Sequence, residues 1–258
     1  MIRGIYTAAA GMAAEMARQD VLANNLANVN TDGFKQDLAV FKTRADKTIY
    51  RVESAGGARG GVPNVEKMGE LSTGVYLDSV NTQFEQGILR QTDEPLDLAI
   101  EGEGYLVIQG PGGEELLTRG GSFTRNAQGL LVDPNGRPLL GKDGPITLSG
   151  KGEIHISNDG VVRQGTKNLG TLRLVNVDRP NEALEKRGDV AWSLKGNATP
   201  QPAQTAQLRQ GYLEGSNVNP IRAMVEMIAV QRSYESSQKM ITAQDETLGK
   251  AVNDLGRV

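Results

Sequence analysis

Apolar residues recur at intervals of seven near the C-terminal end of the chain, in the series Met227, Tyr234, Ile241, Leu248 and Leu255. A companion series is apolar only at its ends, at Met224 and Val252. This spacing predicts one long helix with a narrow apolar seam, as in coiled coils. Asn219 and Pro220 supply a capping side chain and a ring that suits a first helical turn. At about 1.5 Å per residue this helix would run about 54 Å, so we expect it to lie against other helices.

A second apolar stripe starts at the N-terminus, where residues three, four or seven positions apart fall on one side of a helix. The stripe comprises Ile2, Ile5, Ala9, Met12, Met16, Ala23 and Leu26, with Leu22 beside it. It ends before a turn-forming run at residues 30–33. The simpler interpretation of the two stripes is an ordinary helix pair that caps one globular domain. The alternative is a pair of helices that associate with other chains.

Residues 36–86 are predicted to connect these helices to the middle of the chain. Leu38, Val40 and Phe41 favour a short strand or a helix end, and residues 70–84 alternate as in a strand. Between them, the glycines and the proline of residues 56–63 predict a flexible or loop-like passage.

Residues 87–215 have the pattern of an all-β domain, in which short apolar strands alternate with turn signals. Strong turns are expected at residues 133–136, 143–145 and 158–160. Many of the 32 glycines lie in this part of the chain and suit tight turns. The pattern predicts an antiparallel sandwich or a distorted barrel. The fold class is therefore α+β, with one helical domain formed by residues 1–35 and 216–258 and a central β domain at residues 87–215.

Composition narrows the range of partners and compartments. With 28 Lys plus Arg against 31 Asp plus Glu, the net charge of −3 gives no general attraction to nucleic acid or to an anionic membrane. The absence of cysteine excludes disulfides and thiolate metal sites. No apolar run approaches about 18 residues, so no membrane insertion is expected. Residues 1–14 mimic a secretory signal only weakly, and we expect any export to proceed without a cleaved signal peptide.

The residues that could support catalysis or ligand binding are sparse. His155 lies between Ile154 and Ile156, which favours an exposed strand position over a catalytic one. The densest acidic patch comprises Asp93, Glu94, Asp97, Glu101 and Glu103. This patch lacks the oxygen-ligand pattern of an EF-hand, so a solvated turn is the better interpretation.

Three further motifs have simple structural explanations. Gly102 and Gly104 precede a strand, whereas a phosphate-binding loop follows a strand and opens a helix. The tripeptide at residues 197–199 matches a glycosylation acceptor, but so short a match is common by chance. Trp192 is the single tryptophan, which disfavours an aromatic platform for sugars or single-stranded nucleic acid. We therefore predict no enzyme activity, no metal and no cofactor.

Asparagines are concentrated where the N-terminal stripe ends, at Asn24, Asn25, Asn28 and Asn30. Asparagine is a mediocre helix former, so the simplest interpretation is a frayed polar helix end. The alternative is a set of amides that bridge to adjacent helices, and we predict this assembly contact. Together with the two seams, the predicted subunit-assembly residues are Ile2, Ile5, Met12, Met16, Leu22, Asn24, Asn25, Leu26, Asn28, Met224, Met227, Tyr234, Ile241, Leu248, Val252 and Leu255.

Several motifs occur in one order from both termini and the middle of the chain, at residues 22–35, 83–100, 102–105, 118–123, 129–132, 211–219, 226–228 and 231–235. This ordered set resembles the signature of the bacterial flagellar rod and hook protein family, the axial proteins of the basal body. The motifs cover most of the chain outside residues 45–80 and 136–205.

The resemblance implies a structural subunit of the flagellar basal-body rod, which assembles through its terminal helices into a tubular drive shaft. Its partners would be copies of itself, other rod and hook proteins and the flagellar export apparatus, and its location would be the periplasmic rod. Both proximal and distal rod positions fit the motifs, and a hook protein is the alternative. From the residues alone, a monomeric β-rich binding module or a hydrolase with paired carboxylates stays open, although neither explains the terminal helices.

Overall fold

The computed structural model describes residues 2–44, 47–53, 64–72, 74–150, 152–188, 190–196, 198–203 and 205–255. The predicted flexible passage at residues 56–63 and the glycosylation match at Asn197 lie outside the described residues. The chain divides into two compact units. Met1–Asn24, Leu38–Asn81 and Ile221–Val258 form the first, which we call the helical unit. Asn25–Asp37 and Thr82–Pro220 form the second, the β-rich unit.

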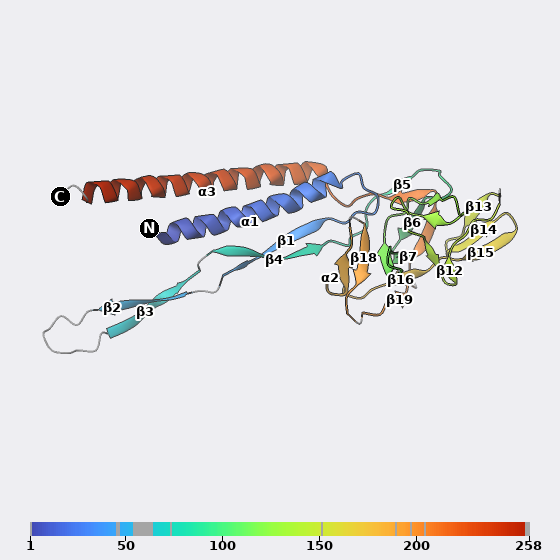
Figure 1. Ribbon diagram of the computed structural model, residues 1–258, viewed down its shortest axis with the longest axis horizontal. Helices are drawn as coiled ribbons and strands as arrows, with labels where there is room; N and C mark the ends of the chain where they lie inside the picture. The colour runs from blue at the N-terminus through green and yellow to red at the C-terminus, as the bar shows by residue number, and fades with distance from the viewer. Residues whose placement is uncertain are drawn as a thin grey trace. The chain divides into compact units, whose positions relative to one another are not determined.

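Two long helices enclose the β-rich middle of the chain in sequence, as predicted. Helix α1 spans Ile2–Ala27 and helix α3 spans Pro220–Leu255. Helix α3 begins directly after Asn219, where the capping signal placed its start. Within the helical unit, α1 lies between α3 and the strands β1 and β4 (Figure 1).

Four strands of the connecting segment form two antiparallel pairs. Strand β1 (Asp37–Thr43) pairs with β4 (Val75–Thr82), and β2 (Lys47–Glu53) pairs with β3 (Asn64–Leu71). Of the two alternatives for Leu38, Val40 and Phe41, a short strand or a helix end, the structure shows the strand. The strand predicted within residues 70–84 is confirmed. Strands β2 and β3 were not predicted, because their charged residues interrupt the apolar alternation on which the prediction relied.

The β-rich unit consists of short strands and one short helix, α2 (Pro180–Ala183). Its first strands are β5 (Leu89–Gln91), β6 (Leu98–Glu101), β7 (Tyr105–Gln109), β8 (Glu115–Thr118), β9 (Thr124–Arg125), β10 (Leu131–Val132), β11 (Leu140–Gly141) and β12 (Gly144–Pro145). The later strands are β13 (Ile154–Ile156), β14 (Val161–Gln164), β15 (Lys167–Thr171), β16 (Leu174–Asn176), β17 (Leu184–Lys186), β18 (Ala191–Leu194), β19 (Gln201–Pro202), β20 (Gln207–Gln210) and β21 (Tyr212–Glu214).

The described strands form several small sheets and one larger one, and they do not close into a barrel. The six-stranded sheet has the order β17-β18-β8-β7-β16-β19, so β17 and β19 are its free edges. A three-stranded sheet, β13-β14-β15, and several two-stranded pairs complete the unit. Of the two predicted alternatives, a sandwich or a distorted barrel, the barrel is thus wrong. Among the described strands, β17 pairs only with β18 and β19 only with β16, so the two edges of the six-stranded sheet do not meet.

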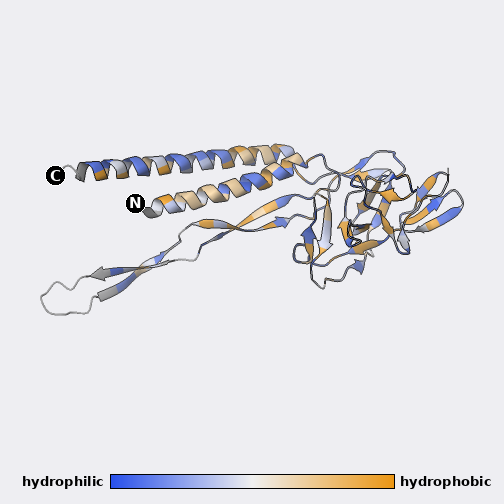
Figure 2. Cartoon of the chain, viewed as in Figure 1, coloured by the Kyte–Doolittle hydropathy of each residue, from blue (hydrophilic) through white to orange (hydrophobic). Residues whose placement is uncertain are grey.

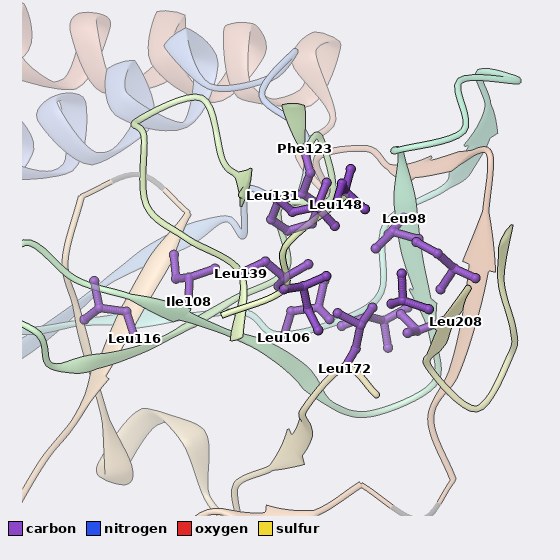
Figure 3. Packing of buried hydrophobic residues seen from close by; sticks show 14 of the residues in the cluster. Leu98, Leu106, Ile108, Leu116, Phe123, Leu131, Leu139, Leu148, Leu172 and Leu208 are labelled. Atoms are coloured by element: carbon purple, nitrogen blue, oxygen red, sulfur yellow. The ribbon is translucent and has the colours of Figure 1, made fainter. Parts of the chain in front are cut away.

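Two apolar clusters give the β-rich unit its core. The larger contains Leu106, Leu139 and Leu172, which come from segments far apart in the sequence (Figure 3). The smaller is built around Trp192, whose ring packs against those of Phe84 and Tyr105 at centroid distances of 5.7 and 5.9 Å. Predicted turns frame these clusters. At residues 133–136, for example, the Gly136 N–H donates to the Asp133 carbonyl at 2.9 Å, with Gly136 at φ +78°.

Candidate assembly surface

Helix α3 presents one partly buried face that follows a seven-residue repeat. The predicted seam residues Met227, Tyr234, Ile241 and Leu248 are all half-buried. The second row of this face was missed by the sequence analysis, and it comprises Ala223, Val230, Ser237, Gln244 and Ala251. The two rows alternate at spacings of four and three residues, which is the spacing of a coiled-coil face.

Helix α1 contacts α3 at two polar points, one beside this face and one within it. The Ser233 hydroxyl donates to Glu15 Oε1 at 2.9 Å. Eleven residues away on each helix, Gln244 lies against Gly4, where a Cβ atom would come within 2.7 Å of Gln244 Nε2. Because the two contacts are equally spaced on both helices in opposite directions, α1 and α3 run antiparallel in one register.

The opposite side of α3 carries large apolar side chains that are exposed to solvent. Ile221 is 74% exposed, Met224 50%, Val225 61% and Ile228 56%. These four residues, which we call the outer stripe, lie three, four and seven positions apart and so share one face of the helix. Figure 2 shows that the apolar residues of α3 are concentrated near this N-terminal end of the helix. Of the four residues of the outer stripe, only Met224 was predicted as an assembly residue.

The other predicted assembly residues fall into four groups. Ile5, Met12, Leu26 and Asn28 are half-buried, whereas Met16, Asn24 and Val252 are exposed. Leu22 is buried in the subunit. The side chains of Ile2 and Leu255 lie outside the described residues.

Asn25 is fully buried and forms its hydrogen bonds within the subunit. Its Nδ2 donates to the Asp37 carbonyl at 2.8 Å, and the Asp37 N–H donates to Asn25 Oδ1 at 2.9 Å. The amide therefore pairs with one residue of strand β1 as a neighbouring strand would. This arrangement gives Asn25 a role inside the chain, besides any role in assembly.

The residues weighed for chemistry are held by ordinary structural contacts. His155 is exposed on β13, as predicted. In the acidic patch, Arg209 pairs with Glu101 at 2.5 Å, and the Thr92 hydroxyl donates to Asp97 at 2.7 Å. Within the described residues, no group of three or more His, Cys, Asp or Glu side chains could hold a metal ion. Nor, over the same residues, does a helix combine the length and apolarity needed to cross a membrane.

Family models match three separate parts of the chain. The model of the flagella basal body rod protein matches residues 5–35, and that of the flagellar hook protein FlgE/F/G D1 domain matches residues 99–164. The model of the flagellar basal body rod FlgEFG protein C-terminal matches residues 209–255. The matched segments thus include most of both long helices and part of the β-rich unit.

Whole-length relatives extend this similarity to nearly all of the chain. It is 36% identical over 263 residues to the flagellar basal-body rod protein FlgG of Caulobacter vibrioides, which covers 96% of this chain and 97% of the relative. It is 35% identical over 241 residues to the flagellar basal-body rod protein FlgF of the same bacterium, at 93% and 92% coverage. The chain belongs to the flagellar basal-body rod protein family. FlgG of Bacillus subtilis is a more distant relative, 32% identical with 98% of this chain covered and 99% of the relative.

Membership of the rod protein family decides between the alternatives that the sequence left open. The family is a structural one, not a family of enzymes, which disfavours the hydrolase. The hook alternative is not favoured either, because these relatives, which match almost end to end, are named rod proteins. The terminal helices, which a β-rich binding module leaves unexplained, are matched by rod models.

Proposed function

We propose that this chain is a structural subunit of the bacterial flagellar basal-body rod and that it assembles through its terminal helices. Copies of the chain, together with other axial proteins of the rod and hook, would form a tubular shaft that carries torque from the motor to the hook. The observation that carries the proposal is the outer stripe of α3, which leaves four large apolar side chains exposed in the single subunit.

The energetics of the outer stripe favour burial against another chain. Fully burying a large aliphatic side chain contributes about 1.5–3 kcal/mol. Four such residues on one helical face form a contiguous docking surface, whereas scattered exposed apolar residues are common and need no explanation. Because the helix carries its partly buried heptad rows on another side, it can contact α1 of its own subunit and a neighbouring copy together.

In the assembled rod, residues 1–35 and 216–258 would form a coiled-coil-like inner layer. Residues 36–86 would connect this layer to an outer layer, formed by the sheets of residues 87–215 packed as a sandwich. The sixteen predicted assembly residues belong to the inner layer. Asn25 would support it indirectly, by fixing the end of α1 to the start of β1.

Delivery to the rod would proceed through the flagellar export apparatus. The chain would pass through the export channel unfolded, without a cleaved signal peptide, and fold as it joins the rod in the periplasm. The weak apolar packing between α1 and α3 supports this route, because helices with Ala, Ser and Gln in one seam row gain little from pairing alone.

Sedimentation velocity over a range of concentrations tests the proposal. The wild-type chain should form larger species as its concentration rises, whereas Ile228→Asp in the outer stripe should remain monomeric. Ser236→Asp is the matched control, because Ser236 is also exposed on α3 but lies outside the stripe. Association of Ile228→Asp at wild-type concentrations would show that the stripe does not carry assembly.

A further inference from the structure

Four peptide bonds join the β-rich unit to the rest of the chain. They lie between Asn24 and Asn25, Asp37 and Leu38, Asn81 and Thr82, and Pro220 and Ile221. We call these four bonds the crossing points. Asn25, Asp37 and Thr82 stand directly at the first three bonds, and Asn217 stands three residues before the fourth. Polar contacts connect these residues with one another and with their neighbours. These contacts form one continuous network within the β-rich unit.

Asp37 joins the first three of these crossing points. Its backbone forms the two hydrogen bonds with Asn25 described above. Its carboxylate accepts a hydrogen bond from the Thr82 hydroxyl at 2.7 Å and pairs with Lys186 at 2.6 Å. Lys186 stands on β17, at one edge of the six-stranded sheet. The crossing points are thereby attached to the main sheet of the unit.

Asn217 joins the fourth crossing point to the others. Its Oδ1 accepts from the Gln36 N–H at 2.7 Å, and its Nδ2 donates to the carbonyls of Gln83 and Glu85 at 2.9 and 3.2 Å. The Gln83 N–H also donates to the Gln36 carbonyl at 2.8 Å. One side chain therefore holds three chain segments together.

A buried ion cluster lies beneath these contacts. Lys35 and Glu214 are fully buried and pair at 2.5 Å, and Arg119 reaches the other Glu214 oxygen at 3.2 Å. Lys35 also donates to the Glu85 carbonyl at 2.6 Å, and the Gly87 N–H donates to Glu214 at 2.9 Å. Burial lowers the pKa of Lys35 from its ordinary value, and the opposing charge of Glu214 works against that shift.

From this arrangement we infer that the network acts as one cooperative clamp on all four crossing points of the β-rich unit. Opening any one crossing segment removes partners from the others, because Asp37, Asn217 and Glu214 each bond to more than one segment. The three segments at residues 31–37, 82–88 and 212–218 therefore open together, and Asn25 is released with Asp37. Unfolding that begins in the terminal helices stops at this boundary unless the whole clamp is released. The inference concerns the single subunit and does not depend on the proposed function.

Hydrogen exchange of the full-length monomer, followed by mass spectrometry, tests the clamp. In the wild type, the amides of the three segments should share one free energy of opening. Thr82→Val removes a single hydroxyl contact and should accelerate exchange in all three segments by about fivefold. Lys35→Met leaves Glu214 without its closest cation and should accelerate all three by at least about 100-fold. Arg90→Ala, which removes an exposed ion pair with Asp32, is the control and should change none of them.

The two variants keep the test decisive. If Lys35→Met also exposes strands β7 and β8 to exchange, the unit has unfolded as a whole, and the conclusion is taken from Thr82→Val. Joint acceleration in all three segments with β7 and β8 still protected supports the clamp. Acceleration confined to residues 82–88, or no acceleration at all, overturns it.

Discussion

Asn25 and Asp37 are twelve residues apart and joined by a pair of hydrogen bonds, in which the amide of Asn25 contacts both the N–H and the carbonyl of Asp37. The contact connects the end of α1 with the first residue of β1. Because Asn25 is fully buried, water cannot replace either bond if the amide is lost. Asn25 is thus a structural junction inside the subunit.

Asn25→Ala should therefore destabilise the monomer. The change leaves the backbone groups of Asp37 without their partner, at a cost of about 1–3 kcal/mol. Thermal unfolding of the dilute monomer, followed by circular dichroism, measures this loss. Asn24→Ala is the matched control, since Asn24 is the exposed neighbour and its replacement should cost much less. Equal melting temperatures for the two variants would contradict the claim that the contact between Asn25 and Asp37 stabilises the monomer.

Gln244 should limit the stability of the α1–α3 pair. Its Oε1 is buried at the contact with Gly4 and accepts no hydrogen bond from the described residues. Gln244→Leu removes this buried polar atom and adds an apolar side chain to the seam, which should stabilise the helix pair by about 1 kcal/mol. Helix content measured against temperature reports the gain. Glu246→Leu, at an exposed position of α3, is the control and should leave the stability of the helix pair unchanged.

A charge placed in the heptad series should harm assembly more than it harms the monomer. Ile241 is only half-buried in the subunit, so Ile241→Asp can keep its carboxylate near water there. In an assembled rod the same charge would be buried at a cost of several kcal/mol. Thr242→Asp, on the exposed side, serves as the control. A loss of monomer stability as large as the assembly defect would mean that the seam belongs to a self-contained core.

Because of Asp32, the free energy of unfolding of the β-rich unit should depend on pH in the mildly acidic range. Burial, and to a smaller extent the charge of Asp97, raises the pKa of Asp32 above its ordinary value of 3.8, while Arg90 opposes the shift. The folded chain therefore holds this proton more tightly than the unfolded chain. The stabilisation it gives is complete below pH 3.8 and is lost as the pH rises through the raised pKa.

Asp32→Asn cannot titrate, so its free energy of unfolding should lack this fall. Urea unfolding between about pH 3.5 and 6, compared for wild type and variant, measures the difference. Asp159→Asn, at an exposed turn, provides the control and should follow the wild type. Parallel pH profiles for wild type and Asp32→Asn would refute the role assigned to burial.

The sequence was most informative where structure depends on neighbouring residues. The start of α3 could be predicted because Asn219 and Pro220 form a local capping signal, and its main seam because large apolar residues recur in one row. The second row of this face could not be predicted, since Ser237 and Gln244 are polar and their burial depends on α1. The outer stripe was missed because Ile221, Val225 and Ile228 lie outside the row that was followed.

Contacts between distant parts of the chain set the limit of the sequence analysis. Lys35 and Glu214 are 179 positions apart, and in isolation each resembles a solvated surface charge. Only the fold brings them together in a fully buried pair. The choice between a sandwich and a barrel was left open for a related reason, because strand pattern alone does not specify whether the edges of a sheet meet.

A helical reconstruction of assembled rods tests the assembly account most directly. We expect the terminal helices to form the inner wall, with Ile221, Val225 and Ile228 covered by a helix of a neighbouring copy. A rod in which these three side chains face water, or in which the β-rich units line the inner wall, would contradict it.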